Sequence, residues 1–282
     1  MMIKAIFDSY GIPILLGMFI ILMIAETRWI LRKRVQDRWK RVVINAIVSL
    51  PAFALLRVLF IPAVVWLAVE NQDWQLGLNY ITPFPEWIEG GIAFMLLDYS
   101  NYLWHILLHK LPLFWRFHLV HHTDLDLDIT TSFRFHFGEM IASLFYRGAV
   151  VILLGVSPVM VLIYEIVFEA ATQFHHSNIK LPFGLERLLS KLIVTPRMHG
   201  IHHSMIRSET DSNYSIIFSF WDRLHRTVRL NIHQSEIVTG VPSYPDEREL
   251  TVGRLLKIPF TKIRGWETRE RDTGRDVGKL KR

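Results

Sequence analysis

The chain has 282 residues, of which 51% are hydrophobic, and it contains no cysteine. The missing thiols exclude disulfides, thiolate metal ligands and a cysteine nucleophile. A formal net charge of +6 comes partly from basic stretches, which we attribute to membrane topology and not to nucleic-acid binding. The thirteen histidines are many for this length, and ten of them lie in short clusters.

Apolar blocks in the N-terminal third predict two membrane helices. Residues 10–31 are long enough to cross a bilayer, at ~20 residues per span, and residues 42–69 form a second block. The loop between them, residues 32–41, is rich in Arg and Lys, whereas residues 70–89 carry four acids and no Lys or Arg. This asymmetry places the basic loop in the cytoplasm and the acidic segment outside.

Three further blocks complete the predicted bundle. Residues 91–108 return the chain to the cytoplasm, and residues 140–155 and 158–173 predict a helical hairpin that enters and leaves from that side. From residue 175 the chain is largely polar, and the segment from residue 246 is expected to be a loose or headgroup-bound charged tail.

The predicted fold is all-α: a multi-pass membrane bundle of about four to five helices with a helical cap in the cytoplasm. We divide the chain into N-terminal membrane helices at 1–90, a catalytic domain at 91–233 and a charged cytoplasmic tail at 234–282.

The histidines form three clusters, all on the predicted cytoplasmic side. His105 and His109 are four residues apart, which puts both rings on one face of a helix. The other two clusters share the pattern H-x-x-H-H, so that the three rings of each are expected to converge on one point. These triplets are His118, His121 and His122, and His199, His202 and His203.

Eight clustered histidines exceed the ligand set of one zinc ion and suit two metal ions with open positions. Imidazole binds iron, copper, nickel and zinc well, so the spacing leaves iron, zinc and copper open. An all-histidine cage is neutral, and acids just outside it would balance the metal charge. Asp98 lies two turns before His105 inside an apolar helix, where an ionisable group is costly and usually functional, and we expect it to accept from a ligand imidazole. The other acids expected to do so are Asp124, Asp128, Glu139 and Asp211.

Several motifs between Asp98 and about Arg229 resemble, in order, those of the fatty acid hydroxylase superfamily, which includes the sterol desaturases. They read DYSNYLWHILLH at 98–109, WRFHLVHHT at 115–123, TSFRFH at 131–136, HSN at 176–178, TPRMHGIHHS at 195–204, ETDSNY at 209–214 and WDRL at 221–224. The resemblance implies two iron ions held by the three clusters, O₂ as oxidant, a lipid substrate and an embedded fold with a cytoplasmic metal site.

The resemblance also implies two further ligands. His136 matches the family's R-x-H position and His176 the histidine of its H-S-N motif, whereas His175 stands where glutamine is expected and is left out. Two positions depart from the family pattern: Phe137 replaces a proline, and His225 begins the segment that usually reads Phe-Gly-Thr.

The function implied is O₂-dependent hydroxylation or desaturation of a lipid such as a sterol, fatty acyl chain, ceramide-like lipid or ether lipid. No haem, flavin or iron–sulfur motif occurs in the sequence, so an external electron donor, a reductase, ferredoxin or cytochrome, is expected. Two alternatives are a zinc-dependent lipid hydrolase and a non-catalytic membrane protein that binds metal or lipid.

Overall fold

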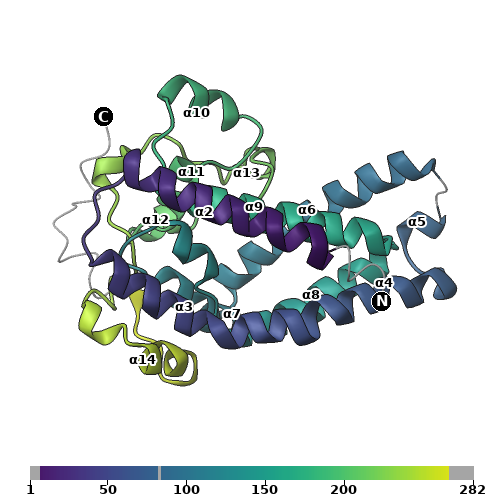
Figure 1. Ribbon diagram of the computed structural model, residues 1–282, viewed down its shortest axis with the longest axis horizontal. Helices are drawn as coiled ribbons and strands as arrows, with labels where there is room; N and C mark the ends of the chain where they lie inside the picture. The colour runs from purple at the N-terminus through teal and green to yellow at the C-terminus, as the bar shows by residue number, and fades with distance from the viewer. Residues whose placement is uncertain (1–6, 82–83, 267–282) are drawn as a thin grey trace.

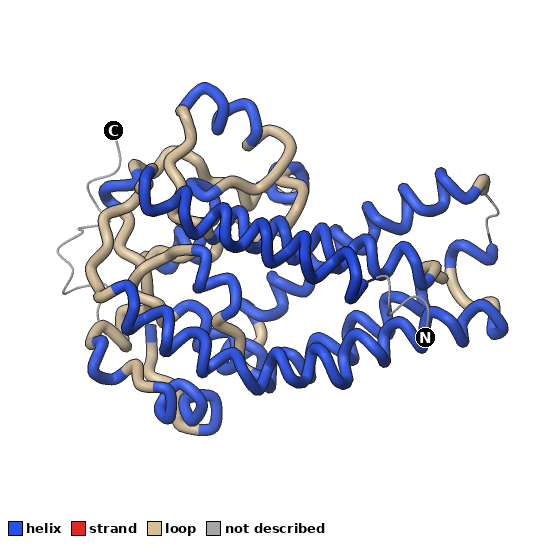
Figure 2. The backbone as a smooth tube through the Cα atoms, in the orientation of Figure 1, coloured by secondary structure: helices blue, strands red, loops and turns tan. Residues whose placement is uncertain are grey.

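The computed structural model describes residues 7–81 and 84–266, and within them the chain is built from helices joined by loops (Figure 2). β-Structure in this part of the chain is limited to three isolated bridges. The predicted all-α fold class is therefore confirmed.

Six long helices form the body of the molecule. They are α2 (Ile12–Arg28), α3 (Arg38–Leu55), α4 (Ile61–Trp74), α6 (Glu86–Lys110), α8 (Phe137–Leu154) and α9 (Pro158–His176). A π-helical turn, η2 (Leu56–Phe60), joins α3 to α4 without a break. It comes directly before Pro62, whose missing N–H removes one helical hydrogen bond.

Short helices gather mainly at the end of the bundle where α2 ends and α3 begins, whereas α5 lies at the opposite end (Figure 1). The short elements are η1 (Phe7–Gly11), α5 (Leu78–Ile81), α7 (Pro112–His122), η3 (Ile129–Phe133), α10 (Phe183–Leu189), α11 (Pro196–His202), α12 (Arg207–Thr210), α13 (Phe220–Leu224), η4 (Gln234–Glu236), η5 (Glu247–Glu249), α14 (Val252–Lys257) and η6 (Ile258–Phe260).

Three described helical segments are long and apolar enough to cross a membrane: Asp8–Arg28, Arg38–Ile81 and Phe137–Leu154. Large apolar side chains along α2 and α3, such as Ile21 and Leu50, are exposed, which suits a lipid environment and not water. The helices α6 and α9 pack against α8 and α4, respectively, but do not meet the same length and apolarity criteria. The structure thus describes a membrane bundle, and the count of four to five spans stays a prediction.

The predicted hairpin corresponds to α8 and α9. Gly155 ends α8 in the left-handed region (φ 71°), and an added Cβ would lie 3.0 Å from the Tyr80 ring. Ser157 then caps α9 by accepting from the Met160 N–H, and Pro158 occupies the first helical turn, where its missing N–H costs nothing.

The C-terminal segment is better packed than a charged tail would be. Leu255 and Ile258 of α14 and η6 are buried against Val48 of α3 and Leu119 of α7. Residues 246–266 are thus part of the fold and not a loose tail, because their apolar side chains complete a second core cluster. The rest of the predicted tail, 267–282, lies outside the described residues.

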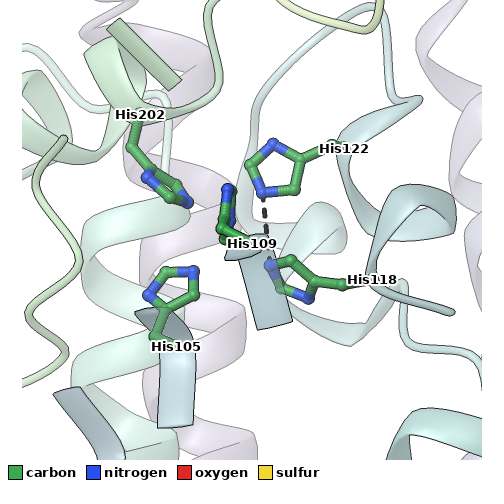
Figure 3. A group of neighbouring side chains, drawn as sticks. All are labelled: His105, His109, His118, His122 and His202. Atoms are coloured by element: carbon green, nitrogen blue, oxygen red, sulfur yellow. Dashed lines mark hydrogen bonds between the residues drawn. The ribbon is translucent and has the colours of Figure 1, made fainter. Parts of the chain in front are cut away.

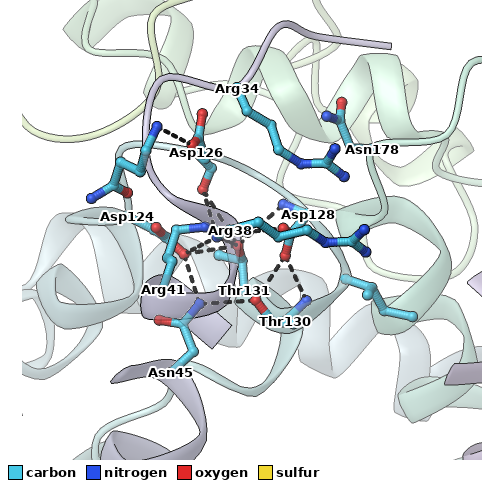
Figure 4. A network of polar contacts seen from close by, with 12 residues as sticks. Arg34, Arg38, Arg41, Asn45, Asp124, Asp126, Asp128, Thr130, Thr131 and Asn178 are labelled. Carbon is cyan, nitrogen blue, oxygen red and sulfur yellow. Dashed lines mark hydrogen bonds and ion pairs between the residues drawn. The ribbon is translucent and has the colours of Figure 1, made fainter. Parts of the chain in front are cut away.

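The basic loop that indicated membrane topology is largely engaged inside the protein. Arg41 of α3 forms ion pairs with Asp124 (2.7 Å between Nη1 and Oδ2) and with Asp128. Asn45 donates to the same Asp124 oxygen (3.0 Å), as Figure 4 shows. Asn45 also accepts from Arg134 (2.6 Å). This buried network ties α3 to the segment that follows α7.

Candidate metal centre

Nine buried histidines form two adjacent groups, within each of which the candidate ligand nitrogens lie within 4.8 Å of one another. The first group is His105, His109, His118, His122 and His202, and its five rings surround one common space (Figure 3). The second group is His121, His176, His199 and His203. All eight cluster histidines and His176 are therefore brought together.

Each H-x-x-H-H triplet serves both groups and does not converge on one point as predicted. On α7, His118 and His122 belong to the first group and His121 to the second. At α11 the arrangement is reversed, since His202 belongs to the first group while His199 and His203 belong to the second. The reason is helical geometry: residues i and i+4 lie nearly above one another, whereas residue i+3 is rotated to the other side of that line.

The outer nitrogens of four rings are held by acceptors. Nδ1 of His105, His176 and His202 lies 2.8 Å from the carbonyl oxygen of Tyr214, Thr172 and Ser212, respectively. A carbonyl only accepts, so these Nδ1 atoms carry the proton and each Nε2 keeps its lone pair. His118 Nδ1 lies 3.1 Å from Glu139 Oε1 in the same way.

The inner nitrogens face one another at short range. His176 Nε2 lies 3.0 Å from His121 Nε2 and 2.9 Å from His199 Nε2, and His199 Nε2 lies 3.1 Å from His203 Nε2. In the first group, Nε2 of His202 is buried without a hydrogen-bond partner among the described residues. Lone pairs that converge in this way repel one another unless a cation lies between them, so the donor set fits metal ions.

Burial keeps these rings neutral. It lowers the pKa of His202 to about 3, and it is also the main cause of the lowered pKa of His121, His122, His199 and His203. A neutral imidazole is the form that binds a metal ion, so the set is ready for metal at neutral pH.

The loop 212–218 positions several of the rings through its backbone. Its carbonyls hold His105, His202 and His175, the last with a distance of 3.2 Å between Nδ1 and the Ile216 oxygen. Asp222 accepts from the N–H groups of Tyr214 (2.8 Å) and Ser215 (3.0 Å), and so fixes the start of this loop. Every residue has a backbone carbonyl, so the sequence does not indicate which carbonyls orient the histidines. Only the acidic residues within ETDSNY and WDRL suggest that this loop is held in place.

Asp98 fixes the other end of that loop and does not contact an imidazole as expected. It accepts from the N–H groups of Ile217 (3.3 Å) and Phe218 (3.1 Å) and from the Trp221 indole (2.8 Å). All three of its hydrogen bonds are to residues 217–221, so Asp98 acts on His105 only through the loop.

The other four acids differ in their positions. Glu139 contacts His118 directly, as expected, and Asp211 Oδ1 lies 3.8 Å from His109 Nδ1 while its other oxygen accepts from Lys110 (2.9 Å). The remaining two, Asp124 and Asp128, pair with Arg41 and not with a histidine.

The structure does not bring His136 to either group. His136 caps α8, where its Nδ1 accepts from the Gly138 N–H (3.0 Å) and its Nε2 lies 3.2 Å from the Leu256 carbonyl oxygen. Both ring nitrogens are thus engaged. His175 also lies outside the groups, although its ring centroid is 4.1 Å from that of His199.

An apolar cavity of about 90 Å³ adjoins the histidines. Side chains of both groups line it, among them His105, His118 and His176. Its other walls include Trp104 and Phe135, and Phe135 stacks on His121 with 4.9 Å between ring centroids. Histidines of both groups therefore border one largely apolar space.

Comparisons with known proteins agree with this geometry. Residues 91–227 match the fatty acid hydroxylase family. Cholesterol 25-hydroxylase of Rattus norvegicus is 27% identical over 161 residues (56% of this chain, 52% of that protein). The ornithine lipid hydroxylase OlsE of Rhizobium tropici is 29% identical over 137 residues, and alkylglycerol monooxygenase of Danio rerio is 26% identical over 178 residues.

These matches cover only part of each relative. The OlsE match covers 47% of this chain and 39% of that protein, and the alkylglycerol monooxygenase match covers 62% and 38%. No solved structure is significantly similar to the chain. The matched segment, residues 91–227, contains both histidine groups and the loop that orients them, and this segment belongs to the fatty acid hydroxylase family.

Proposed function

We propose that this protein is a membrane-bound di-iron oxygenase that hydroxylates or desaturates a lipid. The observation that carries the proposal is the pair of buried histidine groups beside an apolar cavity. The three relatives described above support it, because each is named as a lipid hydroxylase or monooxygenase.

Each histidine group would hold one iron ion, and the ions would supply O₂ activation and oxidation of an unactivated C–H bond. In hydroxylation, RH, O₂, two electrons and two protons give ROH and water. In desaturation, the same inputs remove two hydrogens from adjacent carbons and give a C=C bond and two waters.

The protein's own side chains would bind, orient and exclude water. The loop carbonyls and Glu139 fix the direction of the rings, and a preset geometry avoids reorganisation during the reaction. Apolar walls such as Trp104 and Phe135 would hold the lipid chain against both groups and keep water away.

The electrons would come from an external donor in the cytoplasm, on the side that the charge asymmetry predicts for the histidines. Within the basic loop, Arg32 and Arg41 are buried and hydrogen-bonded, so a docking surface for such a donor could use only its exposed side chains, such as Lys33 and Lys40.

Metal analysis of the full chain purified from membranes tests this proposal. We expect two iron ions per chain and O₂ consumption that requires both reductant and lipid. His121→Ala and His202→Ala each remove a ligand from one group and should lose iron and turnover. His233→Ala is the matched control, since this exposed histidine belongs to neither group.

Tightly bound zinc with hydrolysis that does not require O₂ would overturn the proposal in favour of a hydrolase. Full iron content and activity in His121→Ala or His202→Ala would refute the ligand assignment. Lipid profiles of cells with and without the gene would then identify the substrate.

A further inference from the structure

A cluster of charged side chains lies inside the bundle, away from the histidines. It consists of Arg147 on α8 and of Glu165 and Glu169 on α9. Ionisable side chains at membrane depth are costly and mark functional positions more often than structural ones.

The cluster lies where two cavities meet. Glu165, Glu169 and Leu56 line both the cavity beside the histidines and a second cavity of about 510 Å³. The second cavity is walled mainly by apolar residues of α2 and of the α3–α4 segment, including Leu16 and Phe53. Its wall also includes Arg57, whose charge is paired with Asp8. Because both segments are candidate membrane spans, this second cavity lies where a lipid would approach from the bilayer. The shared residues place the two cavities side by side, with the cluster between them.

One acid of the cluster is already satisfied. Arg147 Nη1 lies 2.7 Å from both carboxylate oxygens of Glu165, and its guanidinium lies over the Phe168 ring at 4.1 Å from the centroid. Removing either member would leave a buried charge unpaired, so this pair has a structural role in joining α8 to α9.

Glu169 is not explained by that role. It follows Glu165 by four residues on the same face of α9, where a second acid is unfavourable. It makes no hydrogen bond or ion pair with any residue of the described chain, and it is partly exposed to the cavities that it lines. The cluster therefore contains two acidic side chains and one basic side chain, and none of its members donates a hydrogen bond to Glu169.

We propose that Glu169 accepts a hydrogen bond from an O–H or N–H group at the polar end of the lipid substrate. This inference rests on the proposed function and adds the chemical class of the substrate: a lipid alcohol or lipid amine. A lipid whose polar end is a carboxylate or phosphate would place a third acid beside the single base of the cluster, which disfavours such a lipid. The apolar cavity beyond the cluster holds the chain, so the distance from Glu169 to the histidines selects which carbon is oxidised.

Equilibrium binding of four tritiated probes of equal chain length tests the proposal. The probes are octadecanol, octadecylamine, octadecanoic acid and octadecane, added to the purified, iron-loaded full chain without reductant. We expect the alcohol and the amine to bind at least about tenfold more tightly than the acid and the alkane, the ratio for one charge-assisted hydrogen bond.

Two substitutions separate charge from hydrogen bonding. Glu169→Gln keeps an acceptor, so alcohol binding should be retained while amine binding falls about tenfold; Glu169→Leu should weaken both. Glu70→Gln is the control, because Glu70 on α4 is partly buried but lines neither cavity. Iron content of each variant checks that the fold is intact.

Equal binding of the acid and the amine, or unchanged preferences in both Glu169 variants, would overturn the inference. Failure of the proposed function is a different result: iron or O₂-dependent turnover would be absent while headgroup-selective binding persisted.

Discussion

The position of the α11 helix depends on a glycine packed against a buried arginine. Gly200 lies between His199 and His202, and an added Cβ would lie 2.2 Å from Arg32 Nη1 and 3.1 Å from Gln234 Oε1. Arg32 Nη1 donates to Gln234 Oε1 (2.7 Å) and to the Pro196 carbonyl (3.1 Å). Burial lowers the pKa of Arg32 to about 10, so it stays charged at neutral pH. Gly200→Ala must therefore displace a buried cation from its acceptors.

The size of the effect follows from three contributions. Losing one charge-assisted hydrogen bond costs about 2 kcal/mol, and overpacking costs about 2 kcal/mol. Replacing a helical glycine with alanine returns about 1 kcal/mol. The free energy of unfolding should thus fall by about 3 kcal/mol, which corresponds to a Tm lower by roughly 6–12 °C.

Thermal unfolding of the purified protein in detergent measures this loss, and iron content measures its effect on the ligands of α11. Gly253→Ala on α14 is the matched control, since nothing lies within 4 Å of its added Cβ, and it should be neutral or slightly stabilising. A Gly200→Ala protein with the Tm and iron content of the parent would refute the reasoning.

Three further predictions concern the acids around the histidines. Asp222→Asn should loosen the loop whose carbonyls hold His105 and His202 and lower iron affinity by about 10–100-fold in a chelator competition, with near-normal helix content by circular dichroism. Glu139→Gln should weaken iron binding by a similar factor of about tenfold or more, because the partner of His118 loses its charge; unchanged affinity would show that this contact is unimportant. Burial raises the pKa of Asp124, but its charged and polar neighbours, Arg41 foremost, outweigh burial and hold that pKa below the usual 3.8. Because the pKa of Asp124 is lower in the folded than in the unfolded protein, its ionised form stabilises the fold above the unfolded-state pKa, and this stability is lost as pH falls through the folded-state pKa. The Tm should therefore fall between about pH 5 and pH 3, and less steeply in Asp124→Asn.

The helical spacing of the histidines predicts which rings come together, because the spacing in His118–His122 and His199–His203 is visible in one dimension. The membrane blocks follow from composition alone. Helical geometry also splits each triplet, but which ring joins which group is not visible in the sequence, since it depends on how α7 and α11 are placed relative to each other.

The positions that sequence analysis misplaced share one cause. Asp98 and His136 are the expected residue types in the expected motifs, but they bond to backbone groups of residues 217–218 and Leu256, far away in sequence. The loop groups that orient His105 and His202 are backbone carbonyls, which every residue type has. Tertiary contacts of this kind leave no periodicity to detect.

The division of each H-x-x-H-H turn between the two groups has a consequence for how metal is acquired. A single helical turn of α7 or α11 carries rings of both groups. The first ion to bind would therefore organise three rings of the other group in advance. Binding of the second ion then loses less conformational entropy than binding of the first. Loading should accordingly be cooperative, with chains that hold a single ion rare at every stage of a titration.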